Sequence, residues 1–184
     1  MSHRSRLLIN FVGFQIAWFA CVLSAANNQP IIGICIALVI VLIHLYLAEN
    51  QKRALSLLAI ITLMGSAWDS VLTNQQILVF SSGMMLPFLA PTWIFAMWLS
   101  FSTTINTAFR WLYHRYFLAF ILGAISGPLT YQAGAALDAV VIPNSLTATV
   151  WIAIGWGVMM PLFILIAERF ETIDTNKNNG VSSS

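Results

Sequence analysis

Six apolar segments make up most of this chain, and each is long enough, or nearly so, to cross a lipid bilayer as a helix. A spanning helix needs about 20 mostly apolar residues. The segments are Leu7–Ala25, Ile31–Leu47, Ala54–Leu72, Thr92–Leu112, Tyr116–Leu137 and Leu146–Ala167. We therefore expect an all-α integral membrane protein. Residues 1–169 would form one bundle of six transmembrane helices, and residues 170–184 a disordered cytoplasmic tail.

The composition excludes a soluble domain of this length. Hydrophobic residues make up 59% of the chain and charged residues only 8%, whereas a soluble domain carries about 25% charged residues. Much of the surface of any globule must face water, so a soluble fold could not hide this much apolar surface. A bilayer is the solvent that suits such a chain.

The basic residues segregate to alternate connections between the six segments. They are Arg4, Arg6, Lys52, Arg53, Arg110, Arg115, Arg169 and Lys177. With six spans they all fall on one side of the membrane, and the positive-inside rule places that side, with both termini, in the cytoplasm. We expect a multi-pass membrane protein. The basic residues form no patch that would bind nucleic acid.

The connection between the third and fourth segments, residues 73–91, is long, uncharged and rather apolar. Residues Ile77–Phe80 and Met84–Phe88 flank a glycine-containing turn, which predicts a short hairpin on the outer face. A re-entrant segment and an interfacial helix are the alternatives. In each form the connection would cap the outer end of the bundle.

One group of polar residues lies toward the cytoplasmic half. Thr103, Asn106 and Arg110 share a face of the fourth predicted helix, and His44 falls at a similar depth on the second. A site that unites His44, Asn106 and Arg110 would suit an anionic headgroup or a carboxylate, because arginine binds such groups in a fork. Alternatively, Arg110 snorkels to the interface, Asn106 joins two helices and His44 is a neutral core histidine.

Asp69 is the only acid predicted within a span, and it lies toward the outer half. Thr62 and Gly65 share its helical face, so a groove of small residues would end in a carboxylate. No basic residue is predicted on that side, which favours Asp69 as a proton or cation site. In the alternative, Asp69 is wet at the outer interface and hydrogen-bonds to residues 74–76.

The fifth segment carries the pair Gly123 and Gly127, whose spacing allows two helices to approach closely. Pro128 predicts a kink. A kinked, glycine-lined helix beside Tyr131 and Gln132 would shape a cavity and add both side chains to the binding candidates. Tight packing between helices explains the same glycines without a ligand.

Motifs for catalysis are absent from the sequence. It has no P-loop, GxSxG or HExxH pattern, and the three histidines are too dispersed for a metal site. We therefore expect no metal and no cofactor, and leave open whether the chain is an enzyme.

Four stretches together resemble the DUF2878 family of small inner-membrane proteins, which has no assigned activity. They are residues 10–19 (NFVGFQIAWF), Trp68-Asp69-Ser70, Trp93–Asn106 and residues 122–131 (LGAISGPLTY). Genes of that family often neighbour those of methyltransferases that resemble cyclopropane-fatty-acid synthase. The resemblance implies a location in the inner membrane of a bacterium and a role in lipid or fatty-acid modification. It implies no catalytic residue.

Three functions follow as hypotheses. The first is lipid binding, or an accessory or enzymatic role in modifying membrane lipids. The second is a small-solute transporter or a substrate-binding transport subunit. The third is a non-catalytic partner of another membrane protein.

Overall fold

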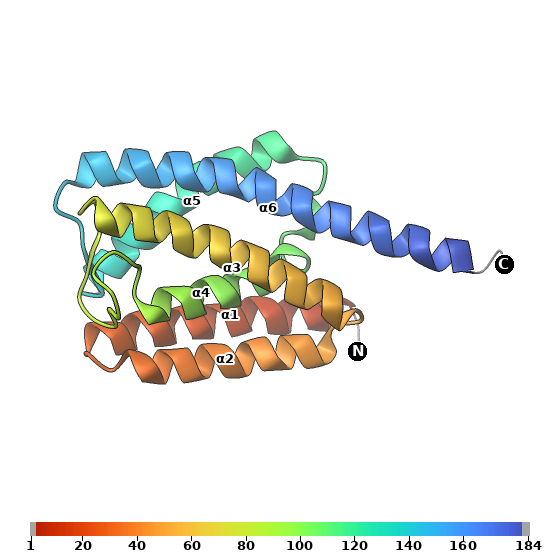
Figure 1. Ribbon diagram of the computed structural model, residues 1–184, viewed down its shortest axis with the longest axis horizontal. Helices are drawn as coiled ribbons and strands as arrows, with labels where there is room; N and C mark the ends of the chain where they lie inside the picture. The colour runs from red at the N-terminus through yellow and green to blue at the C-terminus, as the bar shows by residue number, and fades with distance from the viewer. Residues whose placement is uncertain (1–2, 182–184) are drawn as a thin grey trace.

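The structure, a computed structural model, describes the backbone of residues 3–181 and the side chains of residues 5–172. Within these residues it is an all-helical bundle (Figure 1). The helices are α1 (His3–Ala26), α2 (Pro30–Leu47), α3 (Gln51–Asn74), α4 (Thr92–Ile105), α5 (Tyr116–Ala136) and α6 (Ser145–Val181). Three short elements join them: strand β1 (Val79–Phe80), the 3-10 turn η1 (Arg110–Leu112) and strand β2 (Val140–Val141).

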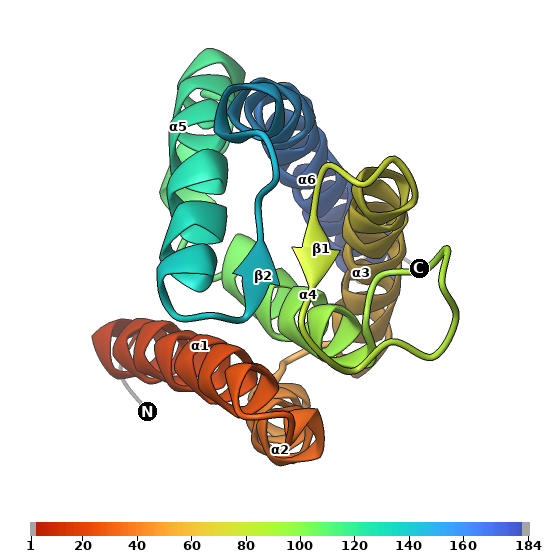
Figure 2. The ribbon, with the colours of Figure 1, turned by 90° about the vertical axis from the view of Figure 1, so that its left-hand side faces the viewer.

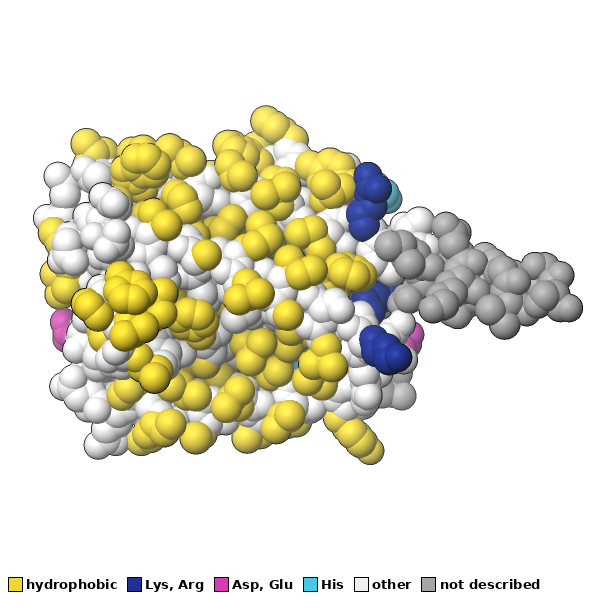
Figure 3. Space-filling view, in the orientation of Figure 1, with side chains coloured by type: hydrophobic (Ala, Val, Ile, Leu, Met, Phe, Trp, Pro, Cys, Tyr) yellow, Lys and Arg dark blue, Asp and Glu magenta, His cyan; other side chains and the backbone are white. Residues whose placement is uncertain are grey.

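Five of these helices are long and apolar enough to cross a membrane, namely α1, α2, α3, α5 and α6. Many large apolar side chains are exposed, among them Leu42, Leu63 and Phe117, and apolar side chains cover much of the flank of the bundle in Figure 3. In water such a surface would be a strong liability, but hydrocarbon suits it. The chain is therefore a membrane protein, with helix bounds close to the predicted segments everywhere except at the fourth and sixth.

The fourth predicted span, Thr92–Leu112, is wrong in its length, because α4 ends at Ile105. The hydroxyls of Ser102, Thr103 and Thr104 donate to main-chain carbonyls three residues earlier, at 2.6 to 2.7 Å. Such bonds compete with the helical ladder and favour its end. Asn106 caps the helix and Arg110 begins η1. The two residues do not share a helical face with Thr103, contrary to the prediction.

Helix α4 forms the centre of the bundle. It packs against α1, α2, α3 and α6, while α5 packs along α6. The end-on view shows α4 behind the two strands and inside the ring of longer helices (Figure 2). Most of its residues are buried, including Trp93 and Trp98. At 14 residues, α4 is shorter than a helix that crosses a bilayer in contact with lipid. Its neighbours, rather than lipid, surround it.

The hairpin predicted within residues 73–91 is also wrong. Strand β1 pairs antiparallel with β2, which follows α5, in the register Val79↔Val141 and Phe80↔Val140. The hydroxyl of Ser81 adds a bond to the carbonyl of Asp138 at 2.7 Å. Residues Met84–Phe88 form no strand. The β1–β2 pair lies across the end of the bundle that faces the viewer in Figure 2.

Helix α6 extends well beyond the sixth predicted segment, which ended at Ala167. Its backbone is helical through Val181, and the domain boundary expected at residue 169 stays a prediction. Glu168, 7% exposed, lies within the part of α6 that is apolar enough to span, and Asp69 is therefore not the only acid in a span. Residues 182–184 lie outside the described part of the chain, and disorder of the tail stays a prediction.

Candidate functional site

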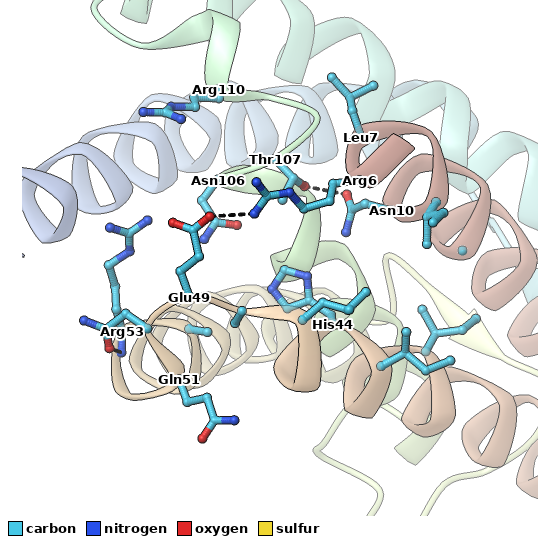
Figure 4. A pocket seen from close by; sticks show the side chains of 18 of the residues that line it. Arg6, Leu7, Asn10, His44, Glu49, Gln51, Arg53, Asn106, Thr107 and Arg110 are labelled. Carbon is cyan, nitrogen blue, oxygen red and sulfur yellow. Dashed lines mark hydrogen bonds and ion pairs between the residues drawn. The ribbon is translucent and has the colours of Figure 1, made fainter. Parts of the chain in front are cut away.

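The basic residues whose side chains the structure describes gather at one end of the bundle, where α1 begins (Figure 3). Arg6, Lys52, Arg53 and Arg110 line a cavity of about 1140 Å³ at this end. We call it the basic-end cavity. Its walls come mainly from α1, from α2, from the connection to α3 with the start of that helix, and from the segment after α4 (Figure 4).

The lining of the basic-end cavity is half polar and half aliphatic. Asn10, His44, Asn106 and Thr107 supply uncharged polar groups, and Leu7, Ile9, Ile40, Ile43 and Leu47 supply apolar surface. The structure thus brings the predicted residues His44, Asn106 and Arg110 to one cavity, although Asn106 and Arg110 arrive through a turn rather than along a helix.

Two polar atoms in this cavity have no hydrogen-bond partner among the residues that the structure describes. They are Nε2 of His44 and Oδ1 of Asn106, and both are buried. Buried polar atoms are nearly always paired with protein or water, and leaving one unpaired costs about 1–3 kcal/mol. The two atoms are therefore available to a bound molecule.

The start of α3 also faces the basic-end cavity. Asn50 caps this helix, because its Oδ1 accepts from the main-chain N–H of Arg53 at 3.1 Å. Residues Asn50 to Arg53 line the cavity wall. The N-terminal end of a helix carries a partial positive charge and favours an anion. This charge adds to that of the arginine and lysine side chains.

Two of the arginines that line the cavity form ion pairs with carboxylates of the protein itself. Arg6 donates to Glu49 at 2.6 Å, and this pair crosses the cavity in Figure 4. Arg110 forms an ion pair with Glu171. The hydrogen bond and the charge of Arg6 lower the pKa of Glu49. Sequence reasoning missed both acids, because neither lies in a predicted span.

Asn10 joins α1 to the end of α4 beside the same cavity. Its Nδ2 donates to the carbonyl and the hydroxyl of Thr103, at 3.1 and 3.0 Å. Its Oδ1 accepts from the hydroxyl of Thr107 at 2.5 Å. The side chain of Asn10 is therefore held in place by the turn that ends α4.

A second cluster surrounds Asp69 on α3, which is 0% exposed. Nε1 of Trp98 donates to its Oδ2 at 2.7 Å, and the hydroxyl of Tyr131 donates to its Oδ1 at 2.5 Å. The alternative of a wet Asp69 at the outer interface is therefore wrong. The structure pairs the predicted candidates Asp69 and Tyr131 and adds Trp98, which the sequence did not single out.

Glycines make room for the tryptophans of this cluster. A Cβ on Gly65 would lie 2.1 Å from Cδ2 of Trp98, so the predicted groove on α3 is filled by that ring. A Cβ on Gly127 would lie 2.5 Å from Cγ of Trp156, and one on Gly123 would meet the main chain of Trp156. The GxxxG pair therefore serves tight packing of α5 on α6.

An aromatic cleft of about 410 Å³ leads to Asp69. Trp98 and Trp156 stack within it at a ring-centroid distance of 4.8 Å. Further walls come from Phe14, Trp18, Phe101, Leu129 and Tyr131. Gln132 is exposed and does not line the cleft; its Nε2 reaches only the hydroxyl of Thr149, at 3.5 Å.

Comparison with known proteins adds one finding. A family model described as "Protein of unknown function (DUF2878)" matches residues 7–162. No curated protein and no solved structure matches the chain. The matched range contains the lining of the aromatic cleft and all of the basic-end cavity apart from Arg6 and Glu171.

Proposed function

The chain belongs to the DUF2878 family, and we propose that it binds the anionic headgroup of a membrane lipid in its basic-end cavity. The observation that carries this proposal is the pair of unpartnered buried atoms, Nε2 of His44 and Oδ1 of Asn106, inside a cavity rimmed by arginines.

A phosphate or carboxylate headgroup needs hydrogen-bond donors and positive charge. Nε2 of His44 donates when that nitrogen carries hydrogen, and the amide of Asn106 offers either its oxygen or, turned over, its two N–H groups. Arg6, Arg53 and the start of α3 supply positive charge around them. Hydrogen bonds that involve an ionised group are about twice as strong as neutral ones.

The aliphatic wall favours a lipid over a free anion. Ile40, Ile43 and Leu47 of α2 line the cavity, and Ile43 and Leu47 are 47% and 39% exposed. An acyl chain attached to a bound headgroup can follow this wall into the bilayer. A small dissolved anion would gain nothing from it.

The orientation proposed here places the basic end in the cytoplasm of a bacterium, with the protein in the inner membrane. The gathering of Lys and Arg at one end supports this orientation through the positive-inside rule. The headgroup would then come from the cytoplasmic leaflet, which is rich in anionic lipid.

Lipid binding by the purified protein tests the proposal. Native mass spectrometry would compare retention of phosphatidylglycerol and phosphatidylcholine by wild type, His44→Leu and Asn106→Ala. We expect wild type to prefer phosphatidylglycerol and each variant to bind phosphatidylglycerol at least about tenfold more weakly, since one such bond is worth roughly 1.5–3 kcal/mol. Arg115→Ala is the control, because Arg115 is exposed at the same end and outside the cavity.

Equal retention of the two lipids by wild type, or variants that behave like Arg115→Ala, would contradict lipid-headgroup binding. If the protein does bind phosphatidylglycerol, a lipid profile of cells that lack the protein would show whether this binding serves lipid modification. Transport and a partner role, the alternatives that the sequence left open, stay predictions.

A further inference from the structure

We propose a second ligand site in the aromatic cleft, where Asp69 receives the ammonium group of a hydrophobic organic cation. This site lies apart from the basic-end cavity and does not depend on the function proposed for it. It would make the chain a receptor or carrier for amphiphilic amines or quaternary ammonium compounds.

Asp69 has neutral hydrogen-bond partners. Trp98 and Tyr131, whose side chains donate to its carboxylate, carry no charge. Among the described residues that line the cleft there is no Lys, Arg or His. A buried carboxylate is costly unless a cation pairs with it. Each carboxylate oxygen accepts more than one hydrogen bond, so both oxygens of Asp69 retain capacity for a further donor.

The walls of the cleft are aromatic. The indole rings of Trp98 and Trp156 stack on one another at a centroid distance of 4.8 Å, and Phe101 meets both rings edge-on at 5.5 and 5.3 Å. Aromatic faces attract organic cations, and tryptophan does so most strongly. A metal ion would want several hard oxygen or nitrogen ligands, and the described residues hold no group of three or more His, Cys, Asp or Glu that could serve one.

The cleft is accessible from the outside of the bundle. It is lined from one side by α1 and from the other by α5. Phe19 on α1 and Leu129 on α5 line it and are 49% and 58% exposed. The cleft therefore opens toward lipid, so its ligand must partition into the bilayer. Its volume of about 410 Å³ falls within the range of about 300–1,000 Å³ typical of small-molecule sites.

A pair of probes of equal shape tests the proposal. Phenyltrimethylammonium carries the charge, and tert-butylbenzene is its neutral counterpart. Binding to the protein in phosphatidylcholine nanodiscs would be measured by equilibrium dialysis, with empty nanodiscs as the blank. We expect saturable binding of the cation to wild type at least about tenfold tighter than that of the neutral probe, which one well-placed charge contact supplies.

Two variants assign this preference to the cleft. Asp69→Asn keeps the shape of the side chain and removes its charge, and should reduce the preference to less than about twofold. Asp138→Asn is the matched control and should bind as wild type does, because Asp138 is an exposed carboxylate outside the cleft. Ser126 lines the cleft at an exposed position, so Ser126→Phe should narrow the cleft. This variant should weaken binding of the cation while Asp69 is unchanged.

Equal affinity of the two probes for wild type would overturn the proposal, and so would an Asp69→Asn protein that keeps the full preference. A carboxyl group that holds only a proton gives no saturable binding of the cation, which is also an overturning result. If Asp69→Asn does not fold, the probe comparison in wild type together with Ser126→Phe still decides the matter.

Discussion

Nε1 of Trp98 donates to Oδ2 of Asp69 at 2.7 Å and so joins the central helix α4 to α3. The indole ring lies against Gly65, one helical turn before Asp69 on the same helix. Gly65 therefore leaves room for the indole ring of Trp98, and Asp69, four residues later, accepts the hydrogen bond of its Nε1. Tyr131 completes the arrangement from α5, so that three helices meet at a single carboxylate.

Removal of the indole donor should destabilise the protein. Trp98→Phe keeps an aromatic ring and leaves Oδ2 of Asp69 without this donor, at an expected cost of about 1–3 kcal/mol. Differential scanning calorimetry in detergent should show a lower midpoint than for wild type. Trp151→Phe is the control, because that ring is half-exposed on the flank. Equal midpoints for the two variants would contradict the importance of the Trp98–Asp69 bond.

The close approach at Gly65 gives a second prediction. Gly65→Ala would place a Cβ 2.1 Å from Trp98, so the ring must move and the variant should lose at least about 1–3 kcal/mol from overpacking. Gly134→Ala provides the matched comparison, because its Cβ would meet only Val140, at 3.5 Å. Thermal unfolding should give a lower midpoint for Gly65→Ala than for Gly134→Ala. A Gly65→Ala protein as stable as Gly134→Ala would count against the tight contact.

Hydropathy predicted the long helices well, because the bilayer makes the length and apolar character of a span a direct property of the sequence. The bounds of α2, for example, differ from the predicted segment by a single residue. The position at which α4 ends could not be predicted from hydropathy. It depends on hydroxyls that bond back to the main chain, a local competition that a count of apolar residues does not register.

Pairings between segments that lie far apart in the sequence could not be predicted either. Strand β1 found its partner in the connection after α5, whereas sequence reasoning considered only its near neighbours. The candidate sites divide in the same way. His44 and Asn106 stood out because polar groups in apolar surroundings need an explanation. The partners of Asp69 depend on the relative rotation of three helices, which no single periodicity contains.

Glu168 should hold the turn before α5 in place. Its Oε1 accepts from the main-chain N–H of His114 at 2.6 Å, and its Oε2 accepts from the hydroxyl of Tyr116 at 2.6 Å. His114 has a φ of 61°, a strained conformation for this residue that needs such support. Glu168→Ala should therefore speed amide hydrogen exchange at His114 by about tenfold. Exchange should stay at the wild-type rate in Arg169→Ala, a change at the exposed neighbouring position.

Glu49 should compete with the proposed headgroup for Arg6. Its carboxylate accepts from Arg6 at 2.6 Å, the position that a lipid phosphate or carboxylate would take. Glu49→Gln removes this internal anion and should strengthen binding of phosphatidylglycerol several-fold at pH 7. Asp138→Asn, a charge-matched change outside the basic-end cavity, should leave binding unaltered. Weaker binding to Glu49→Gln than to wild type would contradict this competition.

The pH dependence of the Glu49→Gln effect follows from the same ion pair. The hydrogen bond and charge of Arg6 hold the pKa of Glu49 below its ordinary value of 4.5. Because the folded pKa is the lower one, the pair stabilises the protein at pH values above 4.5, and this contribution is lost as the pH falls through the folded pKa. The contribution is small, about 0.2–1 kcal/mol for an exposed pair. Wild type and Glu49→Gln should therefore differ by a constant amount in lipid affinity between pH 6 and pH 8, and the difference should shrink only in strongly acidic buffer. A difference that already vanishes at pH 6 would mean that a group other than Glu49 controls access to Arg6.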